Sequence, residues 1–200
     1  MTRKDIRNIT KRLFENSKRH NLELVEINEN SPYVVNAVVE IPKGGSAKYE
    51  YNAELDTFQL DRCLPDSMQY PCSYGFVPST MGQDDDPLDI LIYNNVPIER
   101  GTIVECNVIG ALDMEDSHGQ DWKILGVPTY RGKGYWSLKD VDPMFLKIAD
   151  NFFRHYKDLE DQKKVTVRGW VDKKPALKIV DDCCERFSPI ESLNEFVGEF

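Results

Sequence analysis

The chain lacks several features that would place it in a specialised class of protein. None of its 200 residues fall in an apolar run approaching the length of a membrane-spanning helix, and no signal-peptide core opens the sequence. Positive charge is scarce, with 25 Lys and Arg residues against 34 Asp and Glu residues and a net charge of −9. We therefore expect a cytoplasmic protein whose partners include neither a membrane nor nucleic acid.

Cysteine and histidine are few, and they are scattered. The 5 cysteines form no CxxC motif, and the neighbours Cys183 and Cys184 could bridge each other only with strain. The 3 histidines lie near no motif that would make them a base or a set of ligands, so we interpret them as structural or solvent-facing. No Ser-His-Asp or Cys-His arrangement is present to supply a nucleophile.

What is present has the composition of an ordinary globular domain, with 40% hydrophobic and 30% charged residues. We expect a single domain over residues 31–187, preceded by a basic amphipathic extension (1–30) and followed by an acidic tail (188–200). The extension carries 7 Lys or Arg residues in its first 20 positions and one apolar helical face, formed by Ile6, Ile9, Leu13 and Phe14. An organellar presequence is the alternative interpretation, but Asp5 and Glu15 oppose it.

The hydrophobic periodicity predicts strands first and helices later. Short β-branched or alternating segments, separated by Pro and Gly, favour a curled sheet or barrel. They lie at 33–41, 48–51, 58–60, 88–93, 102–112, 122–127 and 165–171. Asp142 and Pro143 suit the start of a helix that should end near Leu159. Asp172 is a candidate cap for a second helix, with Leu177, Val180 and Cys184 as its apolar seam.

The segment 84–89 is the densest chemical feature, with four carboxylates in six residues directly before an apolar strand. Such a cluster must repel itself, take up protons or hold cations, and hard oxygen donors favour Mg²⁺ or Mn²⁺. Pro87 keeps the segment out of a helix interior. A solvated surface charge run is the simpler interpretation of these carboxylates when they are considered alone.

Other polar residues stand where strands could direct them towards a cleft. Asp121 and Lys123 share one face of an extended segment, and so do Lys48 and Glu50. Each has an ordinary explanation as a surface pair, a turn former or a core residue with a polar tip. Together they supply what phosphoryl transfer needs, namely carboxylates for divalent metals and a proton, and cations for phosphate oxygens.

These residues form ordered motifs that resemble the soluble family I inorganic pyrophosphatases. The family's DxDPxD signature corresponds to residues 84–89, and the resemblance runs from about Tyr33 to about Phe187. The flanking motifs are Glu40-Ile41-Pro42, Lys48-Tyr49-Glu50, Asp61-Arg62, Tyr70-Pro71-Cys72-Ser73-Tyr74-Gly75 and Tyr156-Lys157-Asp158-Leu159-Glu160. A lone acidic triplet would be weak support, whereas the ordered set is specific.

The resemblance implies an α+β, mainly β fold: a five-stranded OB-like closed barrel with flanking helices, here with an N-terminal helical extension. It implies hydrolysis of pyrophosphate to two phosphates by in-line attack of a water activated by several Mg²⁺ ions, with Mn²⁺ as a substitute. It also implies a homo-oligomer, either a dimer or a hexamer.

Residue by residue, the resemblance assigns Asp86 as the carboxylate that takes the proton from water. Asp84, Asp89, Asp116 and Asp121 match metal ligands. Lys48, Arg62, Tyr74, Lys123, Tyr156 and Lys157 match phosphate-binding positions. Glu40 and Glu50 match outer carboxylates that orient metal-bound water. Two positions depart from the pattern: Ser117 replaces a frequent second acid, and Asp85 replaces a frequent glycine.

Two other functions remain as alternatives. Residues 85–89 also fit the DDxxD motif of isoprenoid diphosphate enzymes, but that motif needs a helix, which Pro87 and the following β-rich run oppose. A non-catalytic barrel could use the acidic loop to bind calcium or a partner, although the spacing fails the EF-hand pattern.

Overall fold

The fold is described by a computed structural model over residues 21–65, 67–131, 134, 137–160 and 164–187. The expected N-terminal helix and acidic tail therefore lie outside the described residues, apart from positions 21–30. No helix in the described part is long and apolar enough to cross a membrane. In chain order the elements are η1 (Leu22–Leu24), β1 (Val34–Ile41), β2 (Ala47–Asn52), β3 (Thr57–Cys63), β4 (Ser73–Phe76), β5 (Asp89–Ile92), β6 (Ile103–Asp116), β7 (Gly119–Gln120), β8 (Lys123–Pro128), η2 (Thr129–Arg131), η3 (Leu138–Asp140), α2 (Pro143–His155), β9 (Thr166–Asp172) and α3 (Lys173–Arg186).

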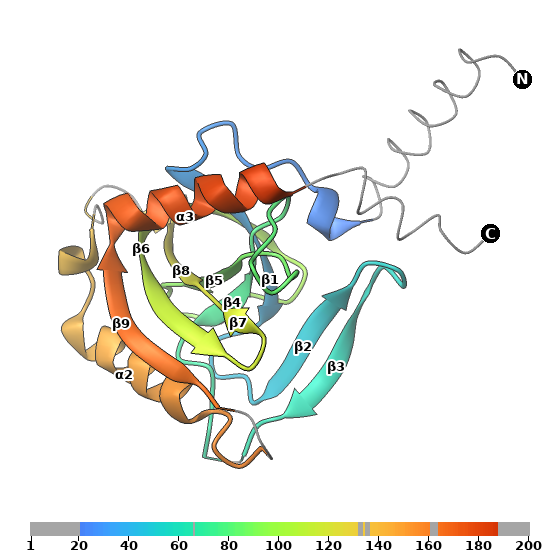
Figure 1. The fold of residues 1–200 in the computed structure, drawn as a ribbon, viewed down its shortest axis with the longest axis vertical. Coiled ribbons are helices and arrows are strands. Elements are labelled where there is room, and N and C mark those ends of the chain that lie inside the picture. Colours follow the sequence, from blue (N-terminus) through green and yellow to red (C-terminus); the bar gives the residue numbers. More distant parts are fainter. Residues whose placement is uncertain (1–20, 66, 132–133, 135–136, 161–163, 188–200) are drawn as a thin grey trace, which may run out of the picture.

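The protein is mainly β-sheet with two longer helices, as expected. Among the described strands, β1, β4, β5, β8 and β6 pair in a closed circuit, since β1 also pairs with β6. All these pairings are antiparallel except β5 with β8, which is parallel. Strand β9 adds to β6, and β2 with β3 forms a separate hairpin that projects from the body (Figure 1).

The strand predictions are confirmed in position, but β6 runs on to Asp116, and two short strands, β4 and the two-residue β7, were not predicted. The segment around Tyr70–Gly75 reads as a turn because of its Pro and Gly, but Ser73–Phe76 forms the fully buried strand β4. A four-residue strand is too short for alternation to reveal, and burial on both sides removes the polar half of the pattern. Gly75 is needed here, because a Cβ would overlap the carbonyl of Val38 on β1.

Both helices begin where the sequence predicts. The Asp142 side chain accepts a hydrogen bond from Met144 N (2.8 Å) with Pro143 at the first turn, and Asp172 caps α3 through Lys173 N (2.9 Å). The predicted end of α2, near Leu159, is wrong by about one turn. The helix stops at His155, and residues 156–160 form turns and a bend.

The buried face of α3 also differs from the prediction. It consists of Ala176, Val180 and Cys183, whereas Leu177 and Cys184 are only partly buried. Leu177 and Cys184 each follow a buried residue by one position, about 100° around the helix, so they lie at the edge of the buried face.

Two main cores divide the molecule, and they place the helices on different sides of the strands (Figure 1). Under α2 lies an aromatic core that includes Phe152 and Phe153, and under α3 lies an aliphatic core that includes Ile90 and Ile124. A smaller cluster near the turn of the hairpin joins Tyr51 to Phe76, and Leu22 packs against it. Residues just before the expected domain boundary at 31 thus pack onto the body.

Candidate active site

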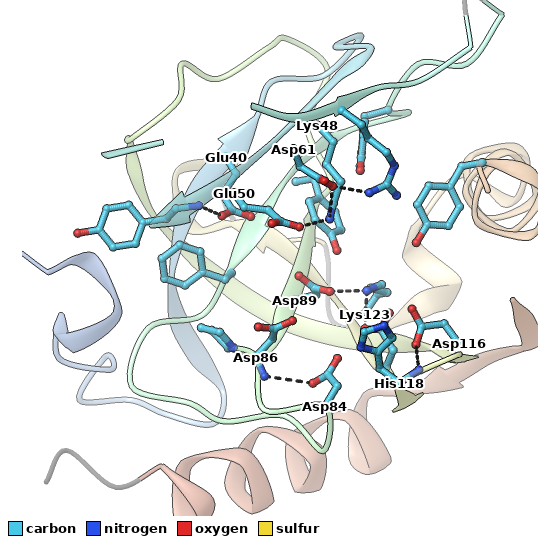
Figure 2. Close-up of a pocket in the computed structure, with 18 of the residues that line it drawn as sticks. Glu40, Lys48, Glu50, Asp61, Asp84, Asp86, Asp89, Asp116, His118 and Lys123 are labelled. Carbon is cyan, nitrogen blue, oxygen red and sulfur yellow. Dashed lines mark hydrogen bonds and ion pairs between the residues drawn. The ribbon is translucent and has the colours of Figure 1, made fainter. Parts of the chain in front are cut away.

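A cleft of about 320 Å³ lies between the hairpin and one end of the strand circuit. Figure 2 shows the acidic loop on one side of this cleft and the hairpin side chains on the other. All thirteen site residues predicted from the sequence line it: Glu40, Lys48, Glu50, Arg62, Tyr74, Asp84, Asp86, Asp89, Asp116, Asp121, Lys123, Tyr156 and Lys157. The structure therefore gathers residues that lie up to 117 positions apart in the chain into one site.

The acidic loop presents Asp84 and Asp86 to the cleft without a cationic partner among the described residues. Burial raises the pKa of the Asp86 carboxyl to about 6, and the nearby charges of Asp84 and Asp89 add to the effect. Burial and the charge of Asp121 likewise raise the pKa of Asp84. A carboxyl with a pKa near 6 can accept a proton efficiently close to neutral pH.

Lys123 forms the most buried charge cluster of the site. Only 3% of the residue is exposed, and its ammonium contacts the carboxylates of both Asp89 and Asp121. Burial alone would lower its pKa, but these two carboxylates raise the pKa of Lys123 well above its usual value. The parallel pairing of β5 with β8 places Asp89 directly opposite Lys123, which explains the first contact.

Asp116 is held at the end of β6 by a second cation. Its Oδ2 accepts a hydrogen bond from Lys157 Nζ (2.8 Å), and its Oδ1 accepts one from the backbone N of His118 (2.8 Å). Burial disfavours the charged form, yet the bond from Lys157 brings the pKa of Asp116 below its ordinary value. Asp116 therefore stays ionised.

The hairpin supplies a third group of charges. Lys48 of β2 pairs with Glu50 and lies 3.2 Å from Asp61, which also contacts Arg62 on β3. Arg62 Nε is 2.6 Å from a Glu160 oxygen, without the angle of a hydrogen bond. Among the described residues Nη2 is a buried donor without a hydrogen-bond partner, so this side of the Arg62 guanidinium is prepared to bind an oxyanion.

Tyrosines form the apolar wall of the cleft. Tyr74 and Tyr156 are 5% exposed, and both pack on Phe153 with ring centroids 6.1 Å and 5.4 Å away. Burial raises the pKa of both phenols, so they remain neutral hydrogen-bond donors. Each is therefore a core residue that also lines the cleft.

Glu40 closes the inner end of the cleft. Its Oε1 accepts a hydrogen bond from the backbone N of Tyr51 (2.7 Å), which joins β1 to the hairpin. Burial raises the pKa of Glu40 to about 8, since the residue is only 7% exposed. Glu40 thus holds the hairpin and presents a second oxygen to the site.

The donor set suits a hard divalent cation. Among the described residues no group of three or more acidic, histidine or cysteine side chains stands close enough to hold an ion in its present arrangement. The chemistry nevertheless fits, because the cleft offers only carboxylate oxygens as anionic donors, and two of them have no cationic partner in the described chain. Mg²⁺ and Mn²⁺ prefer such oxygens.

Several cleft residues were given no role by the sequence. Asp61 stands within a quoted motif but has no assigned function, and it bridges Lys48 and Arg62. Tyr70 packs against Tyr74 in a tilted arrangement, with the ring centroids 5.2 Å apart. His118 is exposed, in agreement with its interpretation as structural or solvent-facing, but it also lines the cleft. Its position two residues after Asp116 is the feature of the sequence that could have placed it at the cleft.

Asp85 is the carboxylate of the loop that does not line the cleft, and its backbone adopts φ +66°. Asp tolerates this left-handed conformation poorly compared with glycine. We expect Asp85→Gly to raise the free energy of unfolding by roughly 0.5 to 1 kcal/mol, the relief of strain less the added chain entropy. Urea denaturation of the metal-free protein measures this. Asp85→Asn is the control, and equal stabilisation by Asn would assign the effect to charge instead of φ.

Comparison with known proteins agrees with this geometry. The family model described as inorganic pyrophosphatase matches residues 37–188. Inorganic pyrophosphatases of Caulobacter vibrioides and Thermus thermophilus are 37% and 40% identical to the chain, each over 84% of it and over 97% and 98% of the relative. The Thermus thermophilus crystal structure superposes with a TM-score of 0.80, covering 84% of this chain and 98% of that one. A Coxiella burnetii pyrophosphatase structure is 42% identical with a TM-score of 0.77, over 82% of this chain and all of that one. The resemblance in the sequence is thus confirmed, and the chain belongs to the inorganic pyrophosphatase family.

Proposed function

We propose that the cleft binds pyrophosphate together with Mg²⁺ and hydrolyses it to two orthophosphates. The observation that carries this proposal is the convergence of all thirteen predicted residues on one cleft, with carboxylates and cations on both of its walls. A diphosphate bears several negative charges, so it needs both the cations of the protein and divalent metal ions to enter an acidic site.

Cations on two sides of the cleft would bind the two ends of the substrate. Lys48 and Arg62 come from the hairpin, while Lys123 and Lys157 come from the body. Arg62 offers its buried Nη2, and the phenols of Tyr74 and Tyr156 add neutral donors. Groups held this way orient the phosphorus atom for in-line attack and stabilise the negative charge on the departing phosphate.

The carboxylates divide into ligands and a base. Asp84, Asp89, Asp116 and Asp121 would hold the divalent ions, and Glu40 and Glu50 would orient nearby waters. When bound, the ions supply Lewis acidity and lower the pKa of water. Asp86 accepts the proton of the attacking water, because its pKa of about 6 suits proton transfer near neutral pH and its carboxylate has no cationic partner among the described residues.

The finer descriptions of fold and assembly belong to the same proposal. The closed circuit of five strands supports the OB-like barrel implied by the resemblance. A homo-oligomer and a cytoplasmic location remain proposals, as do the extension over 1–30, the domain over 31–187 and the tail over 188–200.

Phosphate release from pyrophosphate tests the function directly. With millimolar Mg²⁺ we expect rapid release of two phosphates per pyrophosphate, and with excess EDTA we expect loss of activity by at least about a hundredfold, since the metals supply much of the charge stabilisation. Restoring Mg²⁺ should recover the rate. An allylic diphosphate serves as the comparison substrate. No phosphate release from pyrophosphate with Mg²⁺ would refute the function and favour a binding module, whereas turnover of the allylic substrate would favour the isoprenoid class.

A further inference from the structure

The acidic loop is closed at its base by Thr80. The hydroxyl of Thr80 donates to the carbonyl of Val77 (2.5 Å) and accepts from the backbone N of Leu88 (3.0 Å). A backbone bond from Val77 N to Leu88 O (2.8 Å) completes this closure. The base fixes where the loop leaves the sheet, but it leaves the orientation of Asp84 and Asp86 to contacts nearer the tip.

At the tip, Gly82 contacts the backbone of Asp86 and the carboxylate of Asp84. Its backbone N donates to the carbonyl of Asp86 (2.6 Å), and a Cβ at this position would overlap the Oδ1 atom of Asp84. The same Oδ1 lies 3.4 Å from Asp86 N. The peptide between Met81 and Gly82 therefore contacts both Asp84, the proposed metal ligand, and Asp86, the proposed base.

That peptide and the one before it are held from outside the cleft by the last turn of α3. Met81 N donates to the carbonyl of Cys183 (2.9 Å), which also accepts a hydrogen bond from Phe187 N (3.2 Å) at the helix end. The Arg186 Nε donates to the carbonyl of Met81 (3.1 Å), and its Nη2 lies 3.0 Å from Cys183 Sγ. Because Ala176, Val180 and Cys183 are buried against the sheet, the helix is a rigid support for the loop.

Arg186 also lies close behind the carboxylates. A small hollow on the far side of the loop is lined by Arg186 and Cys183 together with Asp84, Asp89 and Asp121, three residues that line the cleft as well. A cation in this place has two opposite effects on Mg²⁺ binding. Its charge repels the ion, whereas its bond to Met81 orders the ligands.

We infer that Arg186 is a positioning residue for the acidic loop, acting through Met81 and Gly82 to orient Asp84 and Asp86 for metal binding and proton transfer. The inference rests on the proposed function for the role of these carboxylates. The two effects of Arg186 differ in sign, so its removal distinguishes them. Loss of a repelling charge tightens Mg²⁺ binding, and loss of a positioning contact weakens it.

The test measures Mg²⁺ binding to the full-length metal-free protein by titration calorimetry, without pyrophosphate. For Arg186→Met we expect a dissociation constant roughly three- to tenfold higher, somewhat less than the loss of a direct partner of a ligand. Arg186→Lys keeps a donor for Met81 and should recover part of this loss. Lys178→Met removes an exposed cation from the same helix and should bind Mg²⁺ like the parent.

A second readout is phosphate release as a function of Mg²⁺ concentration. Arg186→Met should lose activity at low Mg²⁺ and recover most of it at saturating Mg²⁺. Unchanged or tighter Mg²⁺ binding overturns the inference, as does an equal loss in Lys178→Met. An Arg186→Met protein that is unfolded by circular dichroism overturns it as well, because the role is then general stability. If the parent binds Mg²⁺ but releases no phosphate, the proposed function fails, while the binding comparison still decides the role of Arg186.

Discussion

Asp86→Asn is expected to lower kcat at least about a hundredfold, because an amide cannot accept the proton of the attacking water. Asparagine has nearly the same shape, so the loop and the surrounding cleft should remain intact. The raised pKa of Asp86, about 6, is what suits this carboxyl to the task. Phosphate release at saturating Mg²⁺ and pyrophosphate, with the free energy of unfolding measured alongside, checks the prediction.

Asp85→Asn is the matched control, because it makes the same chemical change in the neighbouring residue. Asp85 is exposed and does not line the cleft, so its variant should keep kcat within about twofold of the parent, an exposed charge having little effect at this range. Near-normal turnover in Asp86→Asn would refute its role as the base. An equal loss in both variants would show that the net charge of the loop matters instead.

Lys123→Met is expected to cause the largest loss of stability, about 3 to 5 kcal/mol in the metal-free protein. The substitution keeps the side-chain volume but leaves the carboxylates of Asp89 and Asp121 without their shared cation in a buried site. Substrate hydrolysis should fall as well, since Lys123 faces the cleft. Urea denaturation near pH 7 measures the loss, and Lys147→Met on the exposed side of α2 is the control.

The pH dependence of this loss identifies its cause. Burial already raises the pKa of the Asp121 carboxyl, and removal of Lys123 would raise it further. A carboxyl whose pKa is higher in the folded state than in the unfolded state destabilises the fold above its folded pKa, and this effect vanishes below the unfolded pKa. The deficit of Lys123→Met should therefore be largest near pH 7 and shrink towards pH 4.

A double variant separates charge from packing. If an unpaired carboxylate causes the loss, then Lys123→Met combined with Asp121→Asn should be more stable near pH 7 than Lys123→Met alone. If the double variant is less stable, or if the deficit stays constant with pH, lost packing is the cause and the electrostatic explanation is wrong.

The sequence by itself determined the family, the strands with clear alternation and the starts of both helices. Capping by Asp142 and Asp172 depends on residues that are close in the chain, so the sequence alone predicts where both helices begin. Ten of the thirteen site residues came from ordered motifs, and Asp116, Asp121 and Lys123 were added by the resemblance to the family; all thirteen line one cleft. Their individual roles stay predictions, which the substitutions described above test.

Only the tertiary structure determines which charged side chains are in contact. The parallel pairing of β5 with β8 sets Asp89 against Lys123, and no local pattern contains that register. The pairing of β2 with β3 likewise sets Lys48 opposite Arg62, with Asp61 between their charges. The contact of Arg186 with Met81 spans 105 positions in the chain. Such contacts follow from how the sheet closes and where α3 packs, and these depend on the whole core at once.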